Sequence, residues 1–151
     1  MGMGDKVTGG ASGYSGTPLA KKLGIKAGFD IRLVNAPEYY FDLFTDLPAN
    51  LFVNENASSK KDFIHFFTKA EEEYIRELPV LKEQMKPNGM IWVSWPKKSS
   101  KVITDVTEDT IRNYAIRIGL VDIKVCAVDE VWSGLKLVIP VKDRAGEQGN
   151  K

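Results

Sequence analysis

The chain has 151 residues, of which 43% are hydrophobic and 27% are charged, and its formal net charge is +1. This composition is typical of a globular domain with its own core and argues against a chain that is disordered throughout. The charge balance gives no global electrostatic reason to expect a nucleic acid or an anionic membrane as partner, and no apolar run reaches the roughly 18 residues of a membrane-spanning helix.

The first segments predict a polar arm and a short helix. Residues 1–16 are rich in Gly and Ser and predict a flexible arm in front of a single domain that spans residues 17–141. The glycines of this arm could cradle a phosphate, but no strand precedes them and the Walker pattern is absent, which favours a plain arm. Thr17 as N-cap and Pro18 as first helical residue predict a helix that Gly24 ends.

The next segment predicts a strand, a turn and a helix. The strand covers residues 30–35 and leads straight into a turn without glycine at residues 35–37. Pro37 is expected to open the helix, where its missing N–H is harmless, and Pro48 to end it. An apolar stripe at i, i+3, i+4 and i+7 supports this helix. The stripe consists of Tyr40, Leu43, Phe44 and Leu47.

The middle of the chain predicts two strands and a long helix. Residues 51–53 form a short strand, and residues 62–67 (DFIHFF) form a strand that is apolar on both faces, as inside a covered parallel sheet. The T-x-x-E capping box at residues 68–71 predicts a helix that runs to about Met85. Pro79 falls inside this helix and should kink or divide it.

A turn, a strand and a capped helix follow. The turn lies at residues 86–89 (KPNG), the strand covers residues 90–95, and a basic loop occupies residues 96–101. Thr107 is expected to cap the next helix, because a threonine hydroxyl can accept a bond from an amide of the first turn. Gly119 is expected to end that helix.

The last part of the chain predicts a hairpin. Residues 121–126 and 135–141 read as two strands, and the connection between them is too short for a helical crossover, so they should pair antiparallel. Residues 142–151 form a polar tail. Together with the alternating strands and helices before it, the hairpin predicts a three-layer, Rossmann-like α/β sandwich with a mostly parallel sheet and an antiparallel C-terminal hairpin.

A candidate ligand site lies where the parallel strands end, because ligands of open α/β sheets bind at that edge. A polar turn follows the first strand there, and a tryptophan and a basic loop follow a central one. The aromatic ring could stack and the lysines could attract an anion, which predicts a small anionic or aromatic ligand; the alternative is a solvated basic loop beside a packed tryptophan. A second tryptophan, in the hairpin connection, could cover the ligand or plug the turn. The candidate ligand-binding residues are Asn35, Pro37, Trp95, Lys97, Lys98 and Trp132.

The chain has one histidine, His65, and one cysteine, Cys126. His65 lies inside the predicted strand of residues 62–67, which favours a buried core histidine over a general base. One His and one Cys cannot supply the three or four N/S ligands of a zinc site, so no metal is expected. Cys126 resembles a small buried hydrophobe, and a single cysteine cannot form an internal disulfide, so a cytoplasmic location is expected.

From residue 28 to residue 141 the order of elements resembles the class I S-adenosylmethionine-dependent methyltransferases. The likeness rests on the strand of residues 62–67, the run KPNGMIWVSWP and the closing hairpin; in that superfamily a Lys-Pro-Gly-Gly turn precedes the fifth strand and an antiparallel pair closes the sheet. The chain departs from the pattern at residues 35–40, which lack the glycine signature, and at Asn54-Glu55, a loose match to the ribose-binding carboxylate. One strand–helix unit before residue 62 is also missing. The resemblance implies a truncated methyltransferase-like fold, and the departures argue against the usual cofactor pose.

A second resemblance is to a family of small bacterial proteins classed as a domain of unknown function. Its motifs SGYSGTPLxxKLGIKxG, VNAP, VSWPKK and VCAVDEVWSGLK match residues 12–28, 34–37, 93–98 and 125–136. Membership implies no activity. We therefore expect a non-catalytic Rossmann-like binding or interaction module without a cofactor; the alternative is a divergent S-adenosylmethionine-dependent methyltransferase-like enzyme.

Overall fold

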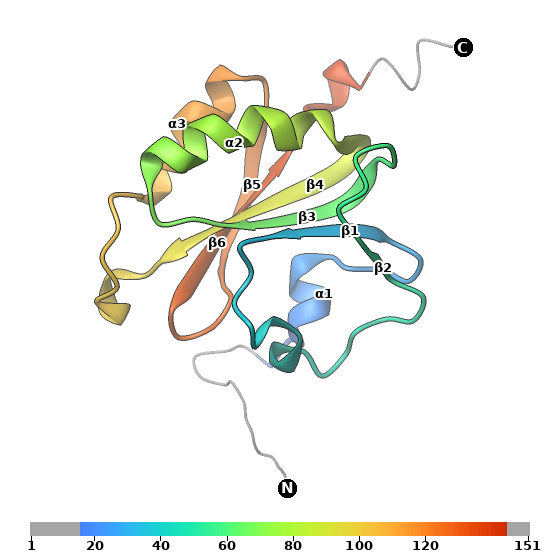
Figure 1. Cartoon of the computed structure of the whole chain (residues 1–151), viewed down its shortest axis with the longest axis horizontal. Coiled ribbons are helices and arrows are strands. Elements are labelled where there is room, and N and C mark those ends of the chain that lie inside the picture. Colours follow the sequence, from blue (N-terminus) through green and yellow to red (C-terminus); the bar gives the residue numbers. More distant parts are fainter. Residues whose placement is uncertain (1–15, 145–151) are drawn as a thin grey trace, which may run out of the picture.

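The computed structural model describes residues 16–144, so the predicted arm and polar tail lie largely outside the described residues. Figure 1 shows the helices and strands, and within residues 16–144 no helix is long and apolar enough to cross a membrane. In chain order the elements are α1 (Leu19–Leu23), β1 (Asp30–Val34), η1 (Tyr40–Leu43), β2 (Phe52–Val53), β3 (Lys61–Phe67), α2 (Glu71–Glu83), β4 (Met85–Pro96), η2 (Lys98–Ser100), α3 (Glu108–Arg117), β5 (Val121–Ala127), β6 (Trp132–Val138) and η3 (Val141–Asp143).

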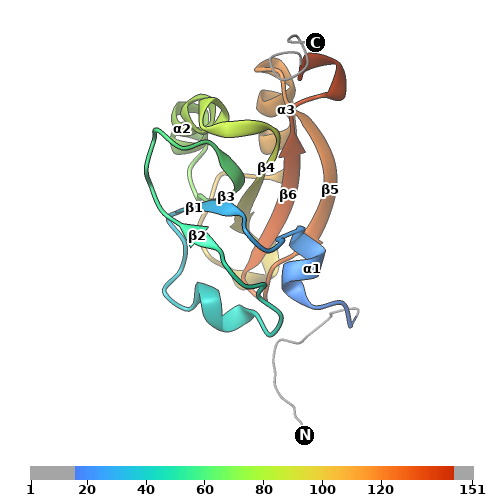
Figure 2. The ribbon, with the colours of Figure 1, turned by 90° about the vertical axis from the view of Figure 1, so that its right-hand side faces the viewer.

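The six strands form one sheet in the order β2-β1-β3-β4-β6-β5. The strands β1 to β4 are parallel to one another, whereas β6 is antiparallel to both β4 and β5. Helices α2 and α3 cover one face of the sheet, and α1 and η1 lie on the other (Figures 1 and 2). The predicted fold class, a mostly parallel Rossmann-like sheet with an antiparallel C-terminal hairpin, is therefore confirmed.

The core has two parts, one on each side of the sheet, and β3 contributes to both. Ile64 and Phe66 point to the side of α2 and α3, and Phe63 points to the side of α1. All three side chains are fully buried, as expected for a central strand covered on both faces. The other buried residues of the cluster that contains Phe63 are Ala20, Leu23, Ile25, Ile31 and Trp92.

The helix predicted between Pro37 and Pro48 is wrong, because the chain forms only the single 3-10 turn η1 there. The segment instead supplies contacts to other parts of the molecule. The Asp46 carboxylate accepts bonds of 3.1 Å from the backbone amides of Ala20 and Lys21, at the start of α1. The N-cap of α1 is Pro18 rather than the predicted Thr17 and makes no side-chain cap, so Asp46 supplies that cap from a distance.

The capping box predicted at residues 68–71 is also wrong. Helix α2 begins at Glu71, after an alanine N-cap, and the Thr68 hydroxyl donates to the Glu73 carboxylate at 2.7 Å. The Asp105 carboxylate accepts from the Glu71 amide at 2.7 Å, so a loop distant in sequence caps this helix. Pro79 lies inside one continuous helix and does not divide it.

The predicted KPNG turn is an irregularity inside a continuous strand. Strand β4 begins at Met85, and its register with β3 shifts between the pair Lys61–Met85 and the pair Phe63–Met90. Gly89 lies in this bulge, where a Cβ would stand only 2.7 Å from the carbonyl oxygen of Lys61. The glycine is required by this close approach of two backbones.

The edge strand β5 is more exposed than its alternating pattern suggests. The side chains of Ile123 and Val125 are 53% and 46% exposed, because β5 has no neighbour beyond β6 and its register shifts after Asp122. The predicted antiparallel pairing with β6 is correct, although β6 begins at Trp132 instead of residue 135.

Thr107 caps α3 as predicted, and its loss should be measurable. Its hydroxyl accepts from the Thr110 amide at 3.1 Å, and the Thr110 hydroxyl accepts from the Thr107 amide at 3.2 Å. We expect Thr107→Ala to lower the free energy of unfolding by about 1 kcal/mol in urea titrations. Thr107→Ser, which keeps the acceptor, is the control and should stay close to the wild-type value.

Candidate functional site

The candidate site is the carboxyl edge, by which we mean the edge of the sheet where β1, β3 and β4 end. Because β6 runs antiparallel to β4, its first residue, Trp132, pairs with Pro96 and lies at the same edge. Asn35 and Pro37 follow β1 there, and Lys97 and Lys98 follow β4. The register thus brings five of the six predicted ligand-binding residues to one edge.

Trp95, the sixth, points away from this edge. It is only 8% exposed and packs in the core on the side of α2 and α3, together with Val106 and Leu135. Of the two interpretations of this residue, the packed tryptophan agrees with the structure, because almost none of its ring is left to stack a ligand.

Asn35 ties the end of β1 to β3 and α2. Its backbone has a φ of 59°, in the left-handed region that asparagine tolerates better than most residues. Its side-chain amide donates to the Phe67 carbonyl and to the Glu73 carboxylate, both at 3.1 Å. The polar end of Asn35 is therefore engaged within the protein.

A second link crosses the carboxyl edge: the hydroxyl of Tyr39 donates to the carboxylate of Asp129 at 2.8 Å. We call this hydrogen bond the clasp. Asp129 lies in the β5–β6 connection, and its other oxygen accepts from the amides of Val131 and Trp132. Burial and the adjacent Asp129 carboxylate raise the pKa of Tyr39 to about 12, so the tyrosine remains a hydrogen-bond donor at neutral pH. The clasp joins the turn after β1 to the far hairpin.

Aromatic rings fill the space behind the clasp. Tyr40 and Phe67 are buried, and their ring centroids are 5.8 Å apart. Phe67 stacks on His65 with a centroid distance of 4.2 Å and meets Trp132 edge to face at 5.0 Å. Trp132 thus packs against the core from the hairpin, which agrees with its interpretation as a plug.

His65 lies in this aromatic cluster and has no exposed surface. Its Nδ1 lies 2.9 Å from the Tyr40 hydroxyl, and its Nε2 lies 2.8 Å from the Ser94 hydroxyl. Burial lowers the pKa of the imidazole from 6.5 to about 3, so the ring is neutral at physiological pH. The predicted core histidine is confirmed.

Asn54 and Glu55 follow β2, at the position where the resemblance places a ribose-binding carboxylate, and the Asn54 side chain is bonded within the protein. The Asn54 side chain donates to the Asp30 carboxylate at 2.9 Å and accepts from the Lys61 ammonium at 2.8 Å. Glu55 is exposed. In residues 16–144 no group of three or more His, Cys, Asp or Glu side chains could hold a metal ion.

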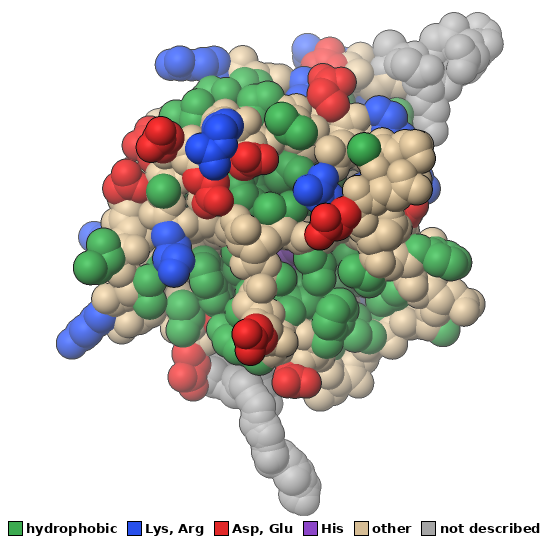
Figure 3. Space-filling view, viewed as in Figure 1, with side chains coloured by type: hydrophobic (Ala, Val, Ile, Leu, Met, Phe, Trp, Pro, Cys, Tyr) green, Lys and Arg blue, Asp and Glu red, His purple; other side chains and the backbone are tan. Residues whose placement is uncertain are grey.

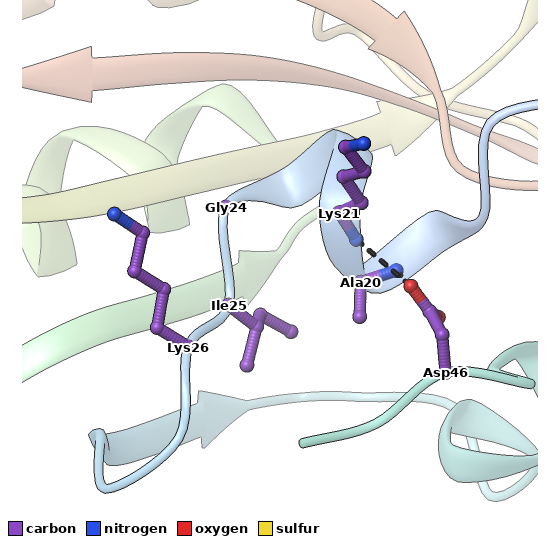
Figure 4. Close-up of a pocket in the computed structure, with 6 residues that line it drawn as sticks. All are labelled: Ala20, Lys21, Gly24, Ile25, Lys26 and Asp46. Carbon is purple, nitrogen blue, oxygen red and sulfur yellow. Dashed lines mark hydrogen bonds between the residues drawn. The ribbon is translucent and has the colours of Figure 1, made fainter.

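Two surface hollows stand out in the described part of the chain, and none of the six predicted ligand-binding residues lines either of them. The first, of about 280 Å³, lies beside α1 and is shown in Figure 4. The second, of about 340 Å³, lies between α2 and α3, where Ile75 and Tyr114 are among its walls.

An apolar patch on η1, β2 and the residues that flank them reaches from Tyr39, at the carboxyl edge, to the opposite end of β1, where Phe52 and Val53 pair with the first residues of that strand. Green side chains gather on the front of Figure 3, over the region where Figure 1 shows these elements. Phe52 is 59% exposed, and a contiguous exposed apolar patch is a feature of interaction sites. The large exposed hydrophobic residues here are Tyr39, Phe41, Leu47, Phe52 and Val53.

Sequence reasoning did not identify the partners that close the edge. Asp129 and Tyr39 lie 90 residues apart, and nothing in their local sequence signals that they meet. Glu73, which receives bonds from both Asn35 and Thr68, reads in the sequence as part of an acidic first helical turn. A signal existed only for Asp129, which precedes a tryptophan by three residues at the start of a hairpin, a position where aspartate often caps backbone amides.

Comparison with known proteins supports the fold and leaves the family open. No protein-family model matches the chain, and no curated protein sequence matches it. Membership in the small bacterial family therefore stays a prediction.

Several solved structures of methyltransferases have a similar fold. A S-adenosylmethionine-dependent methyltransferase from Aquifex aeolicus has a TM-score of 0.55 at 17% identity, over 80% of this chain and 87% of that one. A putative type 11 methyltransferase from Sulfolobus solfataricus has a TM-score of 0.55 at 11% identity, over 83% and 91%. Fibrillarin from Aeropyrum pernix, solved with bound S-adenosylmethionine, has a TM-score of 0.53 at 13% identity, over 80% and 73%. At these identities the likeness shows a shared fold.

Proposed function

We propose that this chain is a methyltransferase-fold protein that acts as a binding or interaction module and does not hold S-adenosylmethionine in the usual pose. The observation that carries the proposal is the closed carboxyl edge. The Tyr39–Asp129 clasp spans it, and the buried rings of Tyr40 and Phe67 fill the space behind the clasp.

Opening this edge for a cofactor requires several native contacts to break. The clasp and the two bonds of the Asn35 amide each contribute about 1 kcal/mol by the usual net value of a hydrogen bond. Ring contacts behind them add to this. The turn itself also contains no glycine that would let a ligand approach its backbone. A partner that binds the outside of the edge avoids these losses.

The surface around the clasp favours an interaction function. The part of the apolar patch that contains Tyr39 and Phe41 adjoins the edge and supplies surface for a partner. Lys97 and Lys98 add positive charge at the end of β4, so a small anionic or aromatic ligand could bind there together with Asn35, Pro37 and Trp132. Trp95 leaves this proposed site because it is buried.

Calorimetric titration with S-adenosylhomocysteine tests the proposal directly. We expect no saturable heat in the micromolar range for the wild-type chain, with a cofactor-binding methyltransferase as positive control. Asp129→Ala removes the clasp and is expected to lower stability without creating cofactor affinity, because the turn after β1 stays glycine-free. Saturable micromolar binding by the wild-type chain would overturn the proposal.

The second candidate function is a divergent S-adenosylmethionine-dependent methyltransferase with a remodelled cofactor pose. The likeness of fold, taken alone, supports this candidate better than the first. The same titration separates the two: micromolar binding of S-adenosylhomocysteine that Trp132→Ala weakens at least tenfold would favour the enzyme. Trp132 is the test position because it is the only partly exposed large ring among the five residues at the edge.

A further inference from the structure

A cluster of like charges lies on the α1 side of the sheet, away from the carboxyl edge. Lys124 on β5 and Lys136 on β6 are directly paired across the two strands. Both share the face of Cys126 and Gly134, whose position adjoins the Trp92 ring of the α1-side core. Like charges directly opposite in an antiparallel pair are destabilising.

A third lysine joins this pair from the segment after α1. The ammonium of Lys136 lies 3.9 Å from the place where a Cβ on Gly24 would stand, so its side chain reaches α1. Burial, together with repulsion from Lys124 and Lys26, lowers the pKa of Lys136. We call Lys26, Lys124 and Lys136 the lysine cluster.

The three ammonium groups have no partner among residues 16–144: no hydrogen bond or ion pair joins any of them to a described residue. Other lysines of the chain are engaged, for example Lys60 with the Glu83 carbonyl and Lys82 with the Ile118 carbonyl. Lys26 and Lys124 are exposed to solvent and Lys136 is half-buried, and a bound anion would offset the repulsion that Lys136 experiences from the other two.

The lysine cluster borders the 280 Å³ hollow beside α1. Lys26 belongs to both, and Gly24, which also lines the hollow, is the residue that the Lys136 ammonium approaches. Figure 4 shows Lys21 and Lys26 extending away from Asp46, whose carboxylate points at the backbone of Ala20 and Lys21 and is bonded there. The acid in the wall of the hollow is thus already paired, and Lys21 adds a further positive charge.

We propose that the lysine cluster binds the phosphate group of a small phosphorylated molecule whose remaining part lies in the hollow beside Gly24. Lysine ammonium groups bind phosphate as point charges, and three of them offset the charge of a phosphomonoester. The compact size of the cluster and the net charge of +1 favour a small ligand over a nucleic acid, which needs a basic stripe along its backbone.

This site is independent of the proposed function of the carboxyl edge, and a phosphate titration tests it. Inorganic pyrophosphate is the probe, and thermal unfolding at low ionic strength is the first measurement. We expect a saturable rise in the melting temperature of the wild-type chain that equal ionic strength of sodium chloride does not reproduce. Lys124→Gln and Lys136→Met should each weaken the binding at least tenfold, and Lys142→Met is the matched control, because Lys142 is an exposed lysine outside the cluster.

A second prediction separates a binding site from a merely solvated patch. Without ligand and at low salt, Lys136→Met should be at least as stable as the wild-type chain, because the repulsion with Lys124 and Lys26 is gone. The single thiol, Cys126, is half-buried beside Lys124 and serves as reporter: pyrophosphate should slow its reaction with a thiol reagent in the wild-type chain and not in Lys136→Met.

Three outcomes would overturn the proposal. The first is an effect of pyrophosphate that sodium chloride matches, and the second is unchanged affinity in both lysine variants. The third is binding of single-stranded RNA through these lysines with no competition by pyrophosphate. Phosphomonoesters with an organic part should bind more tightly than inorganic phosphate, and equal affinities would remove the role of the hollow.

Discussion

Replacing Lys61 with methionine is expected to lower the free energy of unfolding by about 3 kcal/mol, one of the two largest effects that we predict. Lys61 has no exposed surface, although it is charged. Its ammonium donates to the Asn54 side chain, the Asn56 carbonyl and both oxygens of Ser59 at 2.8 to 3.1 Å, and it lies 3.3 Å from the Asp30 carboxylate. Methionine keeps the length of the side chain but removes the one charged donor that these acceptors share.

The position of Lys61 explains why its replacement should loosen one loop in addition to lowering the free energy of unfolding. The loop of residues 54–60 contains no helix or strand, and most of its side chains are exposed. Lys61 holds this loop against the beginnings of β1 and β3. Amide exchange of residues 54–60 should therefore become faster in Lys61→Met than exchange in β3 and β4.

Lys60→Met is the matched control for this prediction. Lys60 is the neighbouring residue, and its exposed ammonium bonds only the Glu83 carbonyl. Its replacement should change stability by less than about 1 kcal/mol, as for most surface substitutions. If urea titrations gave the two variants the same midpoint, the role assigned to Lys61 would be wrong.

The parts of the fold that the sequence predicts are those with local, redundant signals. The strand β3 is apolar on both faces and could belong only inside a covered sheet. Helix α3 has a threonine cap and a glycine stop, and the short connection before β6 allows only an antiparallel hairpin. These signals are enough to place the carboxyl edge and five residues on it.

The parts that were missed depend on contacts between distant segments. The apolar stripe after Pro37 has helical spacing, yet Tyr40 turns inward to His65 and Asp46 caps α1, and these contacts outweigh the weak local preference for a helix. The caps supplied by Asp46 and Asp105 come from other parts of the chain. Sequence spacing carries no information on such pairs.

Contacts between distant segments also explain why the sequence predicts only part of the candidate site. The glycine-free turn after β1 is visible in the sequence, but the closure of the edge is not, because the Tyr39–Asp129 clasp joins residues from opposite ends of the domain. Likewise, the alternation in β5 and β6 shows that Lys124 and Lys136 share a face. The position of Lys26 near them, in the segment after α1, depends on the fold.

The stability of the chain should fall as the pH is lowered from 7 to 5, and His65 is the cause. The folded protein holds this imidazole neutral, with a pKa of about 3 against 6.5 in the unfolded chain. Below pH 6.5 the unfolded state therefore binds a proton that the folded state does not, and stability is lost progressively until the folded pKa is reached. The expected loss between pH 7 and pH 5 is about 2 kcal/mol.

His65 can be isolated in this range because it is the only histidine in the chain. Carboxylates titrate mostly below pH 5, including Asp30, whose pKa is lowered because bonds from Asn54 and Lys61 outweigh its desolvation. His65→Gln keeps hydrogen-bonding groups for Tyr40 and Ser94 but cannot bind a proton. Its stability should thus be nearly flat between pH 7 and pH 5, although lower at pH 7 through imperfect packing.

Proton NMR of the wild-type chain checks the same claim without a variant. The imidazole resonance of folded His65 should not titrate between pH 7 and pH 5, whereas in urea-unfolded chain it should titrate near pH 6.5. A folded-state midpoint near 6.5 would contradict the burial of His65 between Tyr40 and Ser94. Since these three residues lie directly behind the clasp, such a result would also mean that water reaches the space which the aromatic rings are proposed to close.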